Sequence, residues 1–511
     1  MKAAQRLLEL AARDGVRACF ANPGTSEMHL VAALDSAPAI RPVLCLFEGV
    51  ATGAADGYGR MAGAPALTLL HLGPGLANGI ANLHNAYRAR TPIVSLIGEH
   101  ATFHRANNPP LASDIASLAR PVSAWLRTVE QPADLVIMAQ EAIEAARASG
   151  PAALILPADV AWSDEEPTPP APLRPPAQNL DTACLEDAAR ALGPRTLLLL
   201  GGRFLSADAC AAAQRIAAKT GTLALIETFP ARVRREGAGS ELKRLPYLSE
   251  MASAALANID TIILAGAAYP VAFFALPGRP TRLAPEHARV VEIAAPEGQI
   301  GQALETIAAI AKAETAAAPP GAAPLKPDGG GVIDAVAIAQ CLAATLPPEA
   351  IVCDESNTAG LFCFDATART APHDWLTLTG GAIGQGLPLA TGAAIACPDR
   401  RVIALEADGS ALYTIQALWT QARESLNVTN VILNNGAYAI LRLEMMRAGV
   451  NQLSEAANAL FDLKRPAIDY CEIARGFGVP SERVSTPAAF CLALERSYAS
   501  PGPRLIEVMV R

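Results

Sequence analysis

The chain repeats one pattern along its length: short runs rich in leucine and β-branched residues alternate with longer alanine-rich amphipathic runs. Two proline-rich stretches, Ser163–Pro176 and Ala316–Gly331, interrupt this pattern, because proline is excluded from helix interiors and central strands. Three segments result, residues 1–165, 180–315 and 332–511. Strands that alternate with helices form parallel sheets covered on both faces. The sequence therefore predicts an α/β protein with three doubly wound parallel-sheet domains.

The apolar runs give the expected strands of each segment. In the first segment they are Val16–Ala21, Val43–Glu48, Ala66–His71, Pro92–Gly98 and Ala152–Pro157. In the middle segment they are Thr196–Gly201, Thr222–Thr228, Thr261–Ala265 and Val290–Ala294. In the last segment they are Ala350–Asp354, Trp375–Thr379, Arg401–Glu406, Val428–Asn434 and Arg504–Val510.

Charge and cysteine usage limit the partners that such a chain can have. The net charge is −8 at pH 7 and no strongly basic patch stands out, which argues against an extended nucleic-acid-binding surface. The longest uncharged stretches, Met61–Tyr87 and Leu376–Pro398, are rich in Gly, Asn, Thr and Pro, unlike a membrane helix. The ten cysteines form no CxxC pair, and several lie in apolar runs, as buried thiols do in a reducing compartment. We therefore expect a cytoplasmic protein with no nucleic-acid or membrane partner.

Polar residues gather where the predicted strands end. Gly24, Glu48 and His71 fall at or after strand ends of the first segment, and Asp408 and Asn435 do so in the last. In open α/β sheets, ligands bind outside the carboxyl ends of the strands. The middle segment carries few such residues and is expected to be a scaffold. We therefore expect a ligand between the edges of the first and last sheets.

The last segment contains the residues of a metal site. Asp408 and Asn435 are 27 positions apart, about the length that a β-turn-α-β unit needs to return to the neighbouring strand end. A carboxylate and an amide oxygen are hard ligands suited to Mg²⁺ or Ca²⁺. A helix that starts near Ser410 would present free N–H groups to a phosphate. The pattern suits a metal that also holds a diphosphate.

Several motifs together resemble the superfamily of thiamine-diphosphate (ThDP) decarboxylases and acetohydroxyacid synthases. The motifs are ADGS followed by LNNGAY, and also ANPGTSE, ADGYGR, ESNTAG and GGAIGQGLP. The resemblance covers the whole chain and is strongest to benzoylformate decarboxylases and to acetolactate synthase large-subunit-like proteins. It implies a pyrimidine-binding domain in residues 1–165, a middle domain in 180–315 and a diphosphate-binding domain in 332–511.

The resemblance also implies the cofactors and the residues that hold them. By motif, the Mg²⁺ ligands would be Asp408, Asn435 and the carbonyl group of Ala437. The ThDP-binding residues would be Asn357, Thr358, Gly381, Ile383, Gly409 and Ser410. In this family the carbonyl at the Gly381 position meets the aminopyrimidine, and the apolar residue at the Ile383 position bends the cofactor.

The catalytic and substrate-binding residues follow from the same resemblance. Glu48, from the partner subunit, would hydrogen-bond the pyrimidine ring and favour its imino form, and His71 would relay protons to the intermediates. The substrate pocket would include Gly24, Thr25, Ser26, Ile440, Leu441 and Glu444. Each residue also has an ordinary structural alternative, such as a turn at Asp408, a capping acid at Glu48 or a core histidine at His71.

Three positions depart from the family pattern. Ala407 replaces the first glycine of the metal-binding motif and adds a methyl group where backbone and cofactor approach closely. Phe273 falls near the place of the second active-site histidine of benzoylformate decarboxylases. Glu444 stands where an aromatic pocket residue is expected, which argues against a wholly apolar substrate.

Two further cofactors have little support. The middle segment has Gly201-Gly202-Arg203 but no GxGxxG fingerprint, so FAD is unsupported. His100 and His104 have the spacing of one helix face, yet zinc would need a third ligand, and none is evident.

The sequence thus predicts a Mg²⁺- and ThDP-dependent decarboxylase of a 2-keto acid, acting through a C2 ylid and an enamine. An acetolactate synthase-like carboligase is the alternative, and a non-catalytic ThDP-fold scaffold is a third possibility. Because Glu48 and Asp408 are expected to reach one cofactor from different chains, the protein is predicted to be at least a homodimer. The family resemblance suggests a homotetramer.

Overall fold

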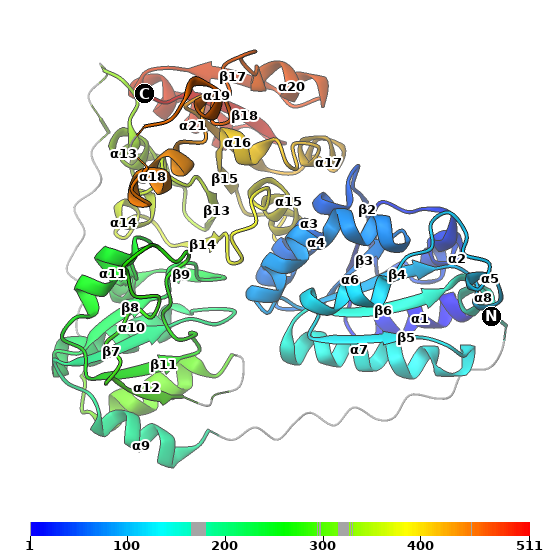
Figure 1. The fold of residues 1–511 in the computed structure, drawn as a ribbon, viewed down its shortest axis with the longest axis horizontal. Coiled ribbons are helices and arrows are strands. Elements are labelled where there is room, and N and C mark those ends of the chain that lie inside the picture. Colours follow the sequence, from blue (N-terminus) through cyan, green and yellow to red (C-terminus); the bar gives the residue numbers. More distant parts are fainter. Residues whose placement is uncertain are drawn as a thin grey trace.

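The computed structural model describes residues 2–164, 180–293, 295, 298–314, 326–327, 329, 331–450 and 452–511. These residues form three β-sheets with flanking helices (Figure 1). The predicted α/β class with three parallel sheets is confirmed. Both predicted linkers lie largely outside the described residues. In the described part of the chain, no helix is long and apolar enough to cross a membrane.

The N-terminal sheet has six parallel strands in the order β2-β1-β3-β4-β6-β5. In chain order they are β1 (Ala18–Ala21), β2 (Arg41–Leu44), β3 (Ala66–Leu70), β4 (Ile93–Glu99), β5 (Trp125–Thr128) and β6 (Ala152–Pro157). The helices are α1 (Ala3–Arg13), η1 (Thr25–Glu27), α2 (Met28–Ala33), η2 (Leu34–Ser36), α3 (Glu48–Ala62), α4 (Leu72–Arg88), α5 (Thr102–Arg105), α6 (Ile115–Ala119), η3 (Arg120–Val122), η4 (Pro132–Asp134), α7 (Leu135–Ser149) and α8 (Ala158–Trp162).

The middle sheet has five parallel strands in the order β10-β8-β7-β11-β12. They are β7 (Thr196–Leu200), β8 (Leu223–Ile226), β10 (Lys243–Arg244), β11 (Thr261–Ala265) and β12 (Arg289–Glu292). The helices are α9 (Thr182–Arg190), α10 (Ala207–Thr220), η5 (Gly237–Glu241), α11 (Ser249–Leu256) and α12 (Ile300–Ile310).

The C-terminal sheet has seven strands in the order β17-β18-β16-β15-β13-β14-β9. They are β9 (Val233–Arg235), β13 (Ala350–Glu355), β14 (His373–Thr377), β15 (Val402–Ala407), β16 (Val428–Asn434), β17 (Ser481–Val484) and β18 (Arg504–Met509). The helices are α13 (Ala335–Thr345), α14 (Cys363–Ala366), α15 (Gly386–Ala396), α16 (Asp408–Ala411), α17 (Ala417–Arg423), α18 (Ala439–Arg447), α19 (Glu455–Ala459), α20 (Tyr470–Gly476) and α21 (Pro487–Ala499). Strand β9 comes from the middle segment and pairs antiparallel with β14.

The ADGYGR motif lies on α3, where the three segments meet. Arg60 and Asp56 form a buried ion pair at 2.7 Å. Arg60 Nη1 also donates to the carbonyl oxygens of Ala231 in the middle segment and Thr377 in the C-terminal segment, at 3.2 and 2.8 Å. A buried arginine is stable only when its charge and donors are satisfied. The motif therefore holds the junction of the domains together.

Helix α3 of the N-terminal domain crosses α15 of the C-terminal domain at close range (Figure 1). A Cβ atom at Gly57 would lie 1.9 Å from the carbonyl oxygen of Leu389, and one at Gly392 would lie 1.7 Å from that of Ala54. Glycine on both helices therefore permits a contact that no side chain would allow. This contact fixes the first and last sheets relative to each other.

Each outer sheet reverses its strand order at one point. In the N-terminal sheet the chain goes from β1 outward to β2 and returns to β3 on the other side of β1. In the C-terminal sheet it goes from β13 outward to β14 and returns to β15 on the other side of β13. Ligands bind in the crevice at such switch points. The loops after β1, β3, β13 and β15 are therefore the places to look for a site.

Candidate active site

The N-terminal cluster lies at the switch point between β1 and β3. Nδ1 of His71, the residue that precedes α4, lies 2.8 Å from Oε2 of Glu27 and 3.1 Å from Oγ of Ser26. Glu27 is fully buried, and its Oε2 also accepts the N–H of Gly24 at 2.9 Å. The carboxylate thus holds a proton on Nδ1 and leaves Nε2 of the ring for a ligand.

Gly24 and Ser26 join this cluster, whereas Thr25 does not. A Cβ atom at Gly24 would lie 2.1 Å from Nδ1 of His71, so only glycine lets the histidine approach the turn. The hydroxyl group of Ser26 donates to Glu27. The Thr25 side chain is exposed. Of the two hydroxyl residues that the sequence predicts in the pocket, Ser26 is the one placed beside His71.

Glu48 is the first residue of α3. The predicted strand Val43–Glu48 is too long, because β2 ends at Leu44 and the chain turns before the glutamate. A carboxylate at a helix N-terminus is favoured by the helix dipole. Asn78 of α4 donates to Oε2 of Glu48 at 3.0 Å, and the glutamate is only 8% exposed. In the described chain, Oε1 has no hydrogen-bond partner.

Glu48 and His71 face the same turn of α4. A Cβ atom added at Gly75 would lie 3.2 Å from Oε1 of Glu48 and 3.2 Å from Cβ of His71. The two predicted catalytic residues therefore belong to one cluster at the edge of the N-terminal sheet. Among the described residues, no hydrogen bond or ion pair joins Glu48 to the predicted metal ligands of the same chain.

The predicted metal ligands lie on two loops in contact, after β15 and after β16. Asp408, 2% exposed, accepts the N–H of Gly409 at 2.9 Å and that of Gly436 at 2.7 Å. Oδ1 of Asn435 accepts the N–H of Ala437 at 2.9 Å. Burial raises the pKa of the Asp408 carboxyl group, so a nearby cation would stabilise its charged form. One carboxylate beside amide and backbone carbonyl oxygens fits Mg²⁺.

The predicted diphosphate residues lie beside these loops. Nδ2 of Asn357, in the loop after β13, lies 3.2 Å from Oγ of the buried Ser410, and Thr358 is the next residue. The helix predicted near Ser410 is α16, only four residues long. Because a macrodipole needs several aligned turns, α16 contributes little of one. Individual N–H and hydroxyl groups are the donors that remain for an anion.

The loop that carries Gly381 and Ile383 is held by Glu355, the last residue of β13. The carboxyl group of Glu355 accepts the N–H of Gly384 at 2.7 Å and that of Gly386 at 2.5 Å. Gly381 has a φ of +76°, a backbone conformation that favours glycine. Ile383 is half-buried. Glu355 therefore fixes the backbone of the loop at Gly384 and Gly386. The two predicted cofactor-binding residues precede these anchor points in the loop.

A second buried acid lies beside the contact of Glu355 with Gly384 and Gly386, which we call the Glu355 clamp. Glu406 of β15 is fully buried, and neither of its carboxyl oxygens has a hydrogen-bond donor among the described residues. Burial raises the pKa of Glu406 well above its usual value, and burial raises the pKa of Glu355 to about 7. The nearby Glu355 carboxyl group raises the pKa of Glu406 further, so the neutral form of Glu406 is favoured. Sequence analysis placed Glu355 at a strand end, as the first residue of ESNTAG, but gave it no role, and it did not single out Glu406.

Helix α18 carries the predicted pocket residues Ile440, Leu441 and Glu444, and none of its residues is buried. Glu444 pairs with Arg447 at 2.6 and 2.7 Å and accepts the hydroxyl group of Tyr247 at 3.2 Å. Its charge is therefore neutralised within the protein. That a carboxylate at this position argues against a wholly apolar substrate stays a prediction.

Ala407 is compatible with the backbone of the metal-binding motif. Its φ of −74° and ψ of 145° are extended values that any residue adopts. The backbone at this position therefore does not require glycine. The concern that the methyl group disturbs the motif finds no support in the chain's own conformation.

In the described part of the middle sheet, the switch point between β7 and β11 is crowded. A Cβ atom at Gly201 would lie 2.4 Å from Oε1 of Glu227 and 2.8 Å from Cα of Ala267. Glu227 also accepts the N–H of Gly202 at 3.2 Å. A side chain therefore fills the place where a dinucleotide would approach a sheet of this type, and FAD remains unsupported.

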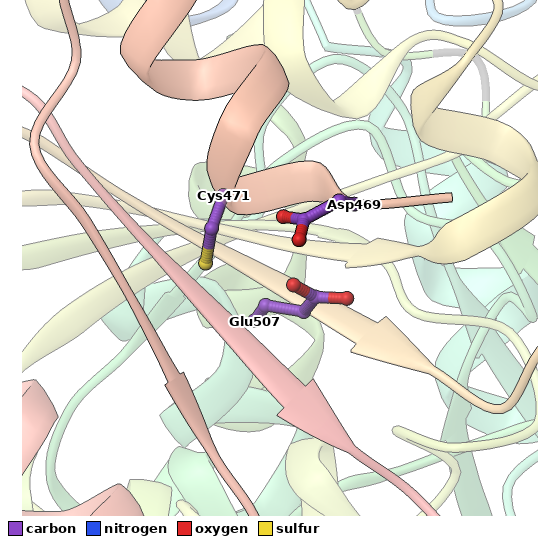
Figure 2. Close-up of side chains that lie close together, drawn as sticks. All are labelled: Asp469, Cys471 and Glu507. Carbon is purple, nitrogen blue, oxygen red and sulfur yellow. The ribbon is translucent and has the colours of Figure 1, made fainter. Parts of the chain in front are cut away.

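A second group of possible metal ligands is neutralised by an arginine. Asp469 and Cys471, at the start of α20, lie near Glu507 of β18, and the two carboxyl groups face each other (Figure 2). Arg483 pairs with both Asp469 and Glu507 at 2.9 Å. Burial raises the pKa of the Cys471 thiol to about 11, which disfavours the thiolate that binds metals. This group is therefore an internal ion-pair cluster.

The histidine pair gives no zinc site either. The rings of His100 and His104 contact edge to face with centroids 5.7 Å apart. Among the described residues, the only group of three or more His, Cys, Asp or Glu side chains close enough to share a metal is the one around Glu507.

Two outer sheets with polar clusters at their switch points, one acidic and one able to hold a metal and a phosphate, define the class of thiamine-diphosphate enzymes. The chain matches the model "Thiamine pyrophosphate enzyme, N-terminal TPP binding domain" over residues 1–116. It matches "Thiamine pyrophosphate enzyme, C-terminal TPP binding domain" over residues 359–508.

Relatives extend this match to the whole chain. It is 49% identical to "Putative acetolactate synthase large subunit IlvX" of Mycobacterium tuberculosis, over 100% of this chain and 99% of the relative. It is 29% identical to a benzoylformate decarboxylase of Pseudomonas aeruginosa, over 98% and 97%. A solved 4-hydroxybenzoylformate decarboxylase of Rhodococcus jostii is similar with a TM-score of 0.84 and 26% identity, over 100% and 99%. The chain belongs to the thiamine-diphosphate enzyme family, as the motifs predicted.

Proposed function

We propose that the chain is a Mg²⁺- and ThDP-dependent carboligase, similar to acetolactate synthases, that decarboxylates a 2-keto acid and transfers its acyl group to an acceptor carbonyl. The 49% identity to the IlvX protein along the full chain carries this proposal. A second observation supports it: Phe273 rather than a histidine lies against Gly381. With one proton donor fewer beside Gly381, capture of the acyl group by a carbonyl is favoured over its protonation.

The residues at the carboxyl ends of the strands of the C-terminal sheet, which we call the C-terminal edge, fit the cofactors by their chemistry. We assign Mg²⁺ to Asp408, Asn435 and the carbonyl group of Ala437, and the diphosphate to Asn357, Thr358, Gly409 and Ser410. When bound, ThDP supplies a carbon nucleophile and an electron sink for decarboxylation. The clamp of Glu355 on Gly384 and Gly386 holds the loop with Gly381 and Ile383 in place for the pyrimidine ring.

The residues of the N-terminal edge handle protons. Asn78 fixes Oε2 of Glu48 and leaves Oε1 free, so this oxygen is the one that meets the pyrimidine ring. Glu27 fixes Nδ1 of His71 and leaves Nε2 for a substrate group. Proton transfer by positioned groups contributes about 10²- to 10⁴-fold to a rate.

We assign the two edges of one active site to different subunits. Glu48 has no contact with Asp408 or Asn435 in the described single chain, so a homodimer is the smallest active unit that this assignment allows. A homotetramer of two such dimers follows the family resemblance.

The ten cysteines all lie in the described residues as free thiols, which supports the expected cytoplasmic location.

Simple decarboxylation is the second candidate function. His71, held by Glu27 at 2.8 Å, is a group that could relay a proton to the intermediate, which favours release of an aldehyde. The structural likeness to 4-hydroxybenzoylformate decarboxylase also favours it.

The products separate the two functions. We would incubate the holoprotein with a 2-keto acid, with and without an acceptor, and measure CO₂, free aldehyde and 2-hydroxyketone or 2-hydroxy-3-keto-acid products. A carboligase gives mainly the ligated product, whereas free aldehyde as the sole product contradicts the proposal. If ThDP and Mg²⁺ give no heat in a calorimetric titration, the chain is a non-catalytic scaffold.

A further inference from the structure

Four aromatic side chains of the middle domain form a wall beside the C-terminal edge. The ring centroid of Phe273 lies 5.7 Å from those of Phe229 and Tyr247 and 4.9 Å from that of Phe274. The contacts of Phe273 with Phe229 and Phe274 are edge to face, and the one with Tyr247 is tilted. Such contacts add stability beyond area burial. We call these four residues the aromatic wall.

The wall touches the loop to which the pyrimidine ring is assigned. A Cβ atom at Gly381 would lie 2.3 Å from Cζ of Phe273, so the ring tip rests directly on that glycine. Yet Phe273 and Phe274 are 43% and 57% exposed. Large aromatic surfaces left in water beside a site are covered favourably by an apolar ligand.

Helix α18 is tied to the same wall by charged contacts. Arg447 binds both carboxyl oxygens of Glu250 at 3.1 and 2.6 Å and also pairs with Glu444. Tyr247, a wall residue, donates to Glu444. Burial raises the pKa of Tyr247 to about 12, so its hydroxyl group remains protonated and donating. These contacts tie the C-terminal half of α18 to the wall and pair the charges of Glu444 and Arg447.

From this geometry we propose that Phe273 and Phe274 determine substrate specificity and that the preferred 2-keto acid carries an aromatic ring. The ring packs on the open faces of these two side chains, next to Gly381. A substrate with only a methyl group, such as pyruvate, would leave both faces in water. This inference rests on the proposed function, because it assumes that a 2-keto acid reacts at this edge.

Binding of unreactive analogues tests the wall without catalysis. We would titrate the holoprotein, loaded with ThDP and Mg²⁺, with mandelate and with lactate in a calorimeter. We expect mandelate to bind at least about tenfold more tightly than lactate, since an aromatic ring buries far more surface than a methyl group. Phe273→Ala should weaken mandelate binding about tenfold and leave lactate binding unchanged. Phe103→Ala, which removes a 73% exposed aromatic ring on α5, is the matched control and should change neither affinity.

Kinetics then separate this inference from the proposed function. We expect kcat/KM for benzoylformate to exceed that for pyruvate about tenfold or more, and Phe273→Ala to remove this preference. If mandelate and lactate bind with equal affinity, or if Phe273→Ala weakens both affinities equally, the aromatic wall does not determine specificity, even if pyruvate reacts. If mandelate binding depends on Phe273 but no 2-keto acid reacts, the proposed function fails and the wall stands. Phe273→Leu, which keeps most of the volume, replaces Phe273→Ala if the latter does not fold.

Discussion

The N-terminal and C-terminal sheets share one architecture but differ in what lies at their switch points. The N-terminal edge carries side chains that can move protons: Asn78 fixes Glu48, and Glu27 and Ser26 contact His71. The C-terminal edge carries oxygen atoms and backbone N–H groups around Asp408. In the proposed function, the same strand topology carries proton transfer on one side and cation and phosphate binding on the other.

The middle sheet completes this comparison. Its switch point is filled by Glu227, and its contributions to the site come from the wall around Phe273 instead. A parallel sheet therefore provides a place for a ligand, but the residues at its strand ends decide whether that place is used.

The largest expected effect concerns the C-terminal edge. Asp408→Ala removes the one carboxylate that the proposal gives to Mg²⁺, so Mg²⁺-dependent binding of ThDP should weaken by about a hundredfold or more, and activity should be lost. Calorimetric titration measures this directly. The control is Asp469→Asn in the ion-pair cluster of Figure 2, which should leave cofactor binding unchanged. If Asp469→Asn weakened ThDP binding and Asp408→Ala did not, the metal site would have to be assigned to the ion-pair cluster.

The N-terminal edge should act on rate rather than on cofactor binding. Glu48→Gln keeps the shape of the side chain but removes its charge, so kcat should fall by about 10²- to 10⁴-fold. Affinity for ThDP should change only severalfold. Exchange of the C2 proton of bound ThDP, followed by NMR after acid quench, reports the affected step. Glu99→Gln, a buried acid at the end of β4, is the control and should retain the exchange rate. Unchanged exchange in Glu48→Gln would contradict the role of this edge.

A smaller effect is expected at the Glu27–His71 pair. His71→Ala should lower aldehyde release about tenfold and ligation less, because only the aldehyde needs a proton on the former carbonyl carbon. Glu27→Gln should shift the product ratio in the same direction but by a smaller factor, since the ring remains and only its orientation is lost. Product ratios by chromatography measure both. A parallel loss of both products would show that the pair only supports the fold.

The last prediction concerns stability rather than catalysis. His373 of β14 is fully buried, and burial lowers its pKa to about 4. The nearby Arg235 lowers this pKa slightly further, whereas Asp374 raises it slightly. The folded state therefore keeps the ring neutral, and this contribution is present above pH 6.5 and lost as the pH falls toward 4. The loss amounts to roughly 3 kcal/mol at most. His373→Phe should unfold with a weaker acid dependence in urea titrations at pH 7 and pH 4. An equal acid dependence in both proteins would refute this.

The alternation of apolar and amphipathic runs was sufficient to predict the three parallel sheets. Thr261–Ala265, Val428–Asn434 and Ala152–Pro157 were predicted with their exact bounds. The strands β5 and β17 were missed, because Trp125–Thr128 and Ser481–Val484 lie at sheet edges and have mixed polarity. Such edge strands do not carry the continuous apolar run of a central parallel strand.

The candidate site was predictable where residues stand next to a strand end in sequence. Asp408, Asn435 and His71 are of this kind. Glu27 was missed because its partner His71 is 44 positions away, although its place three residues after Gly24 was a capping signal. Glu355 and Glu406 were missed because only tertiary contact reveals two acids buried together. The aromatic wall joins Tyr247 to Phe273 across α11, β11 and the loops between them, which no local pattern specifies.

The central claim is that each active site takes Glu48 from one chain and Asp408 from its neighbour. The most direct test mixes two inactive variants, Glu48→Gln and Asp408→Ala, by co-expression with different tags and isolates the hybrid dimers. One of the two sites in each hybrid would then be intact, so the hybrids should recover about half of the wild-type activity. If both groups of one site belong to the same chain, every site in the hybrid carries a defect, and the hybrids will be as inactive as the two variants alone.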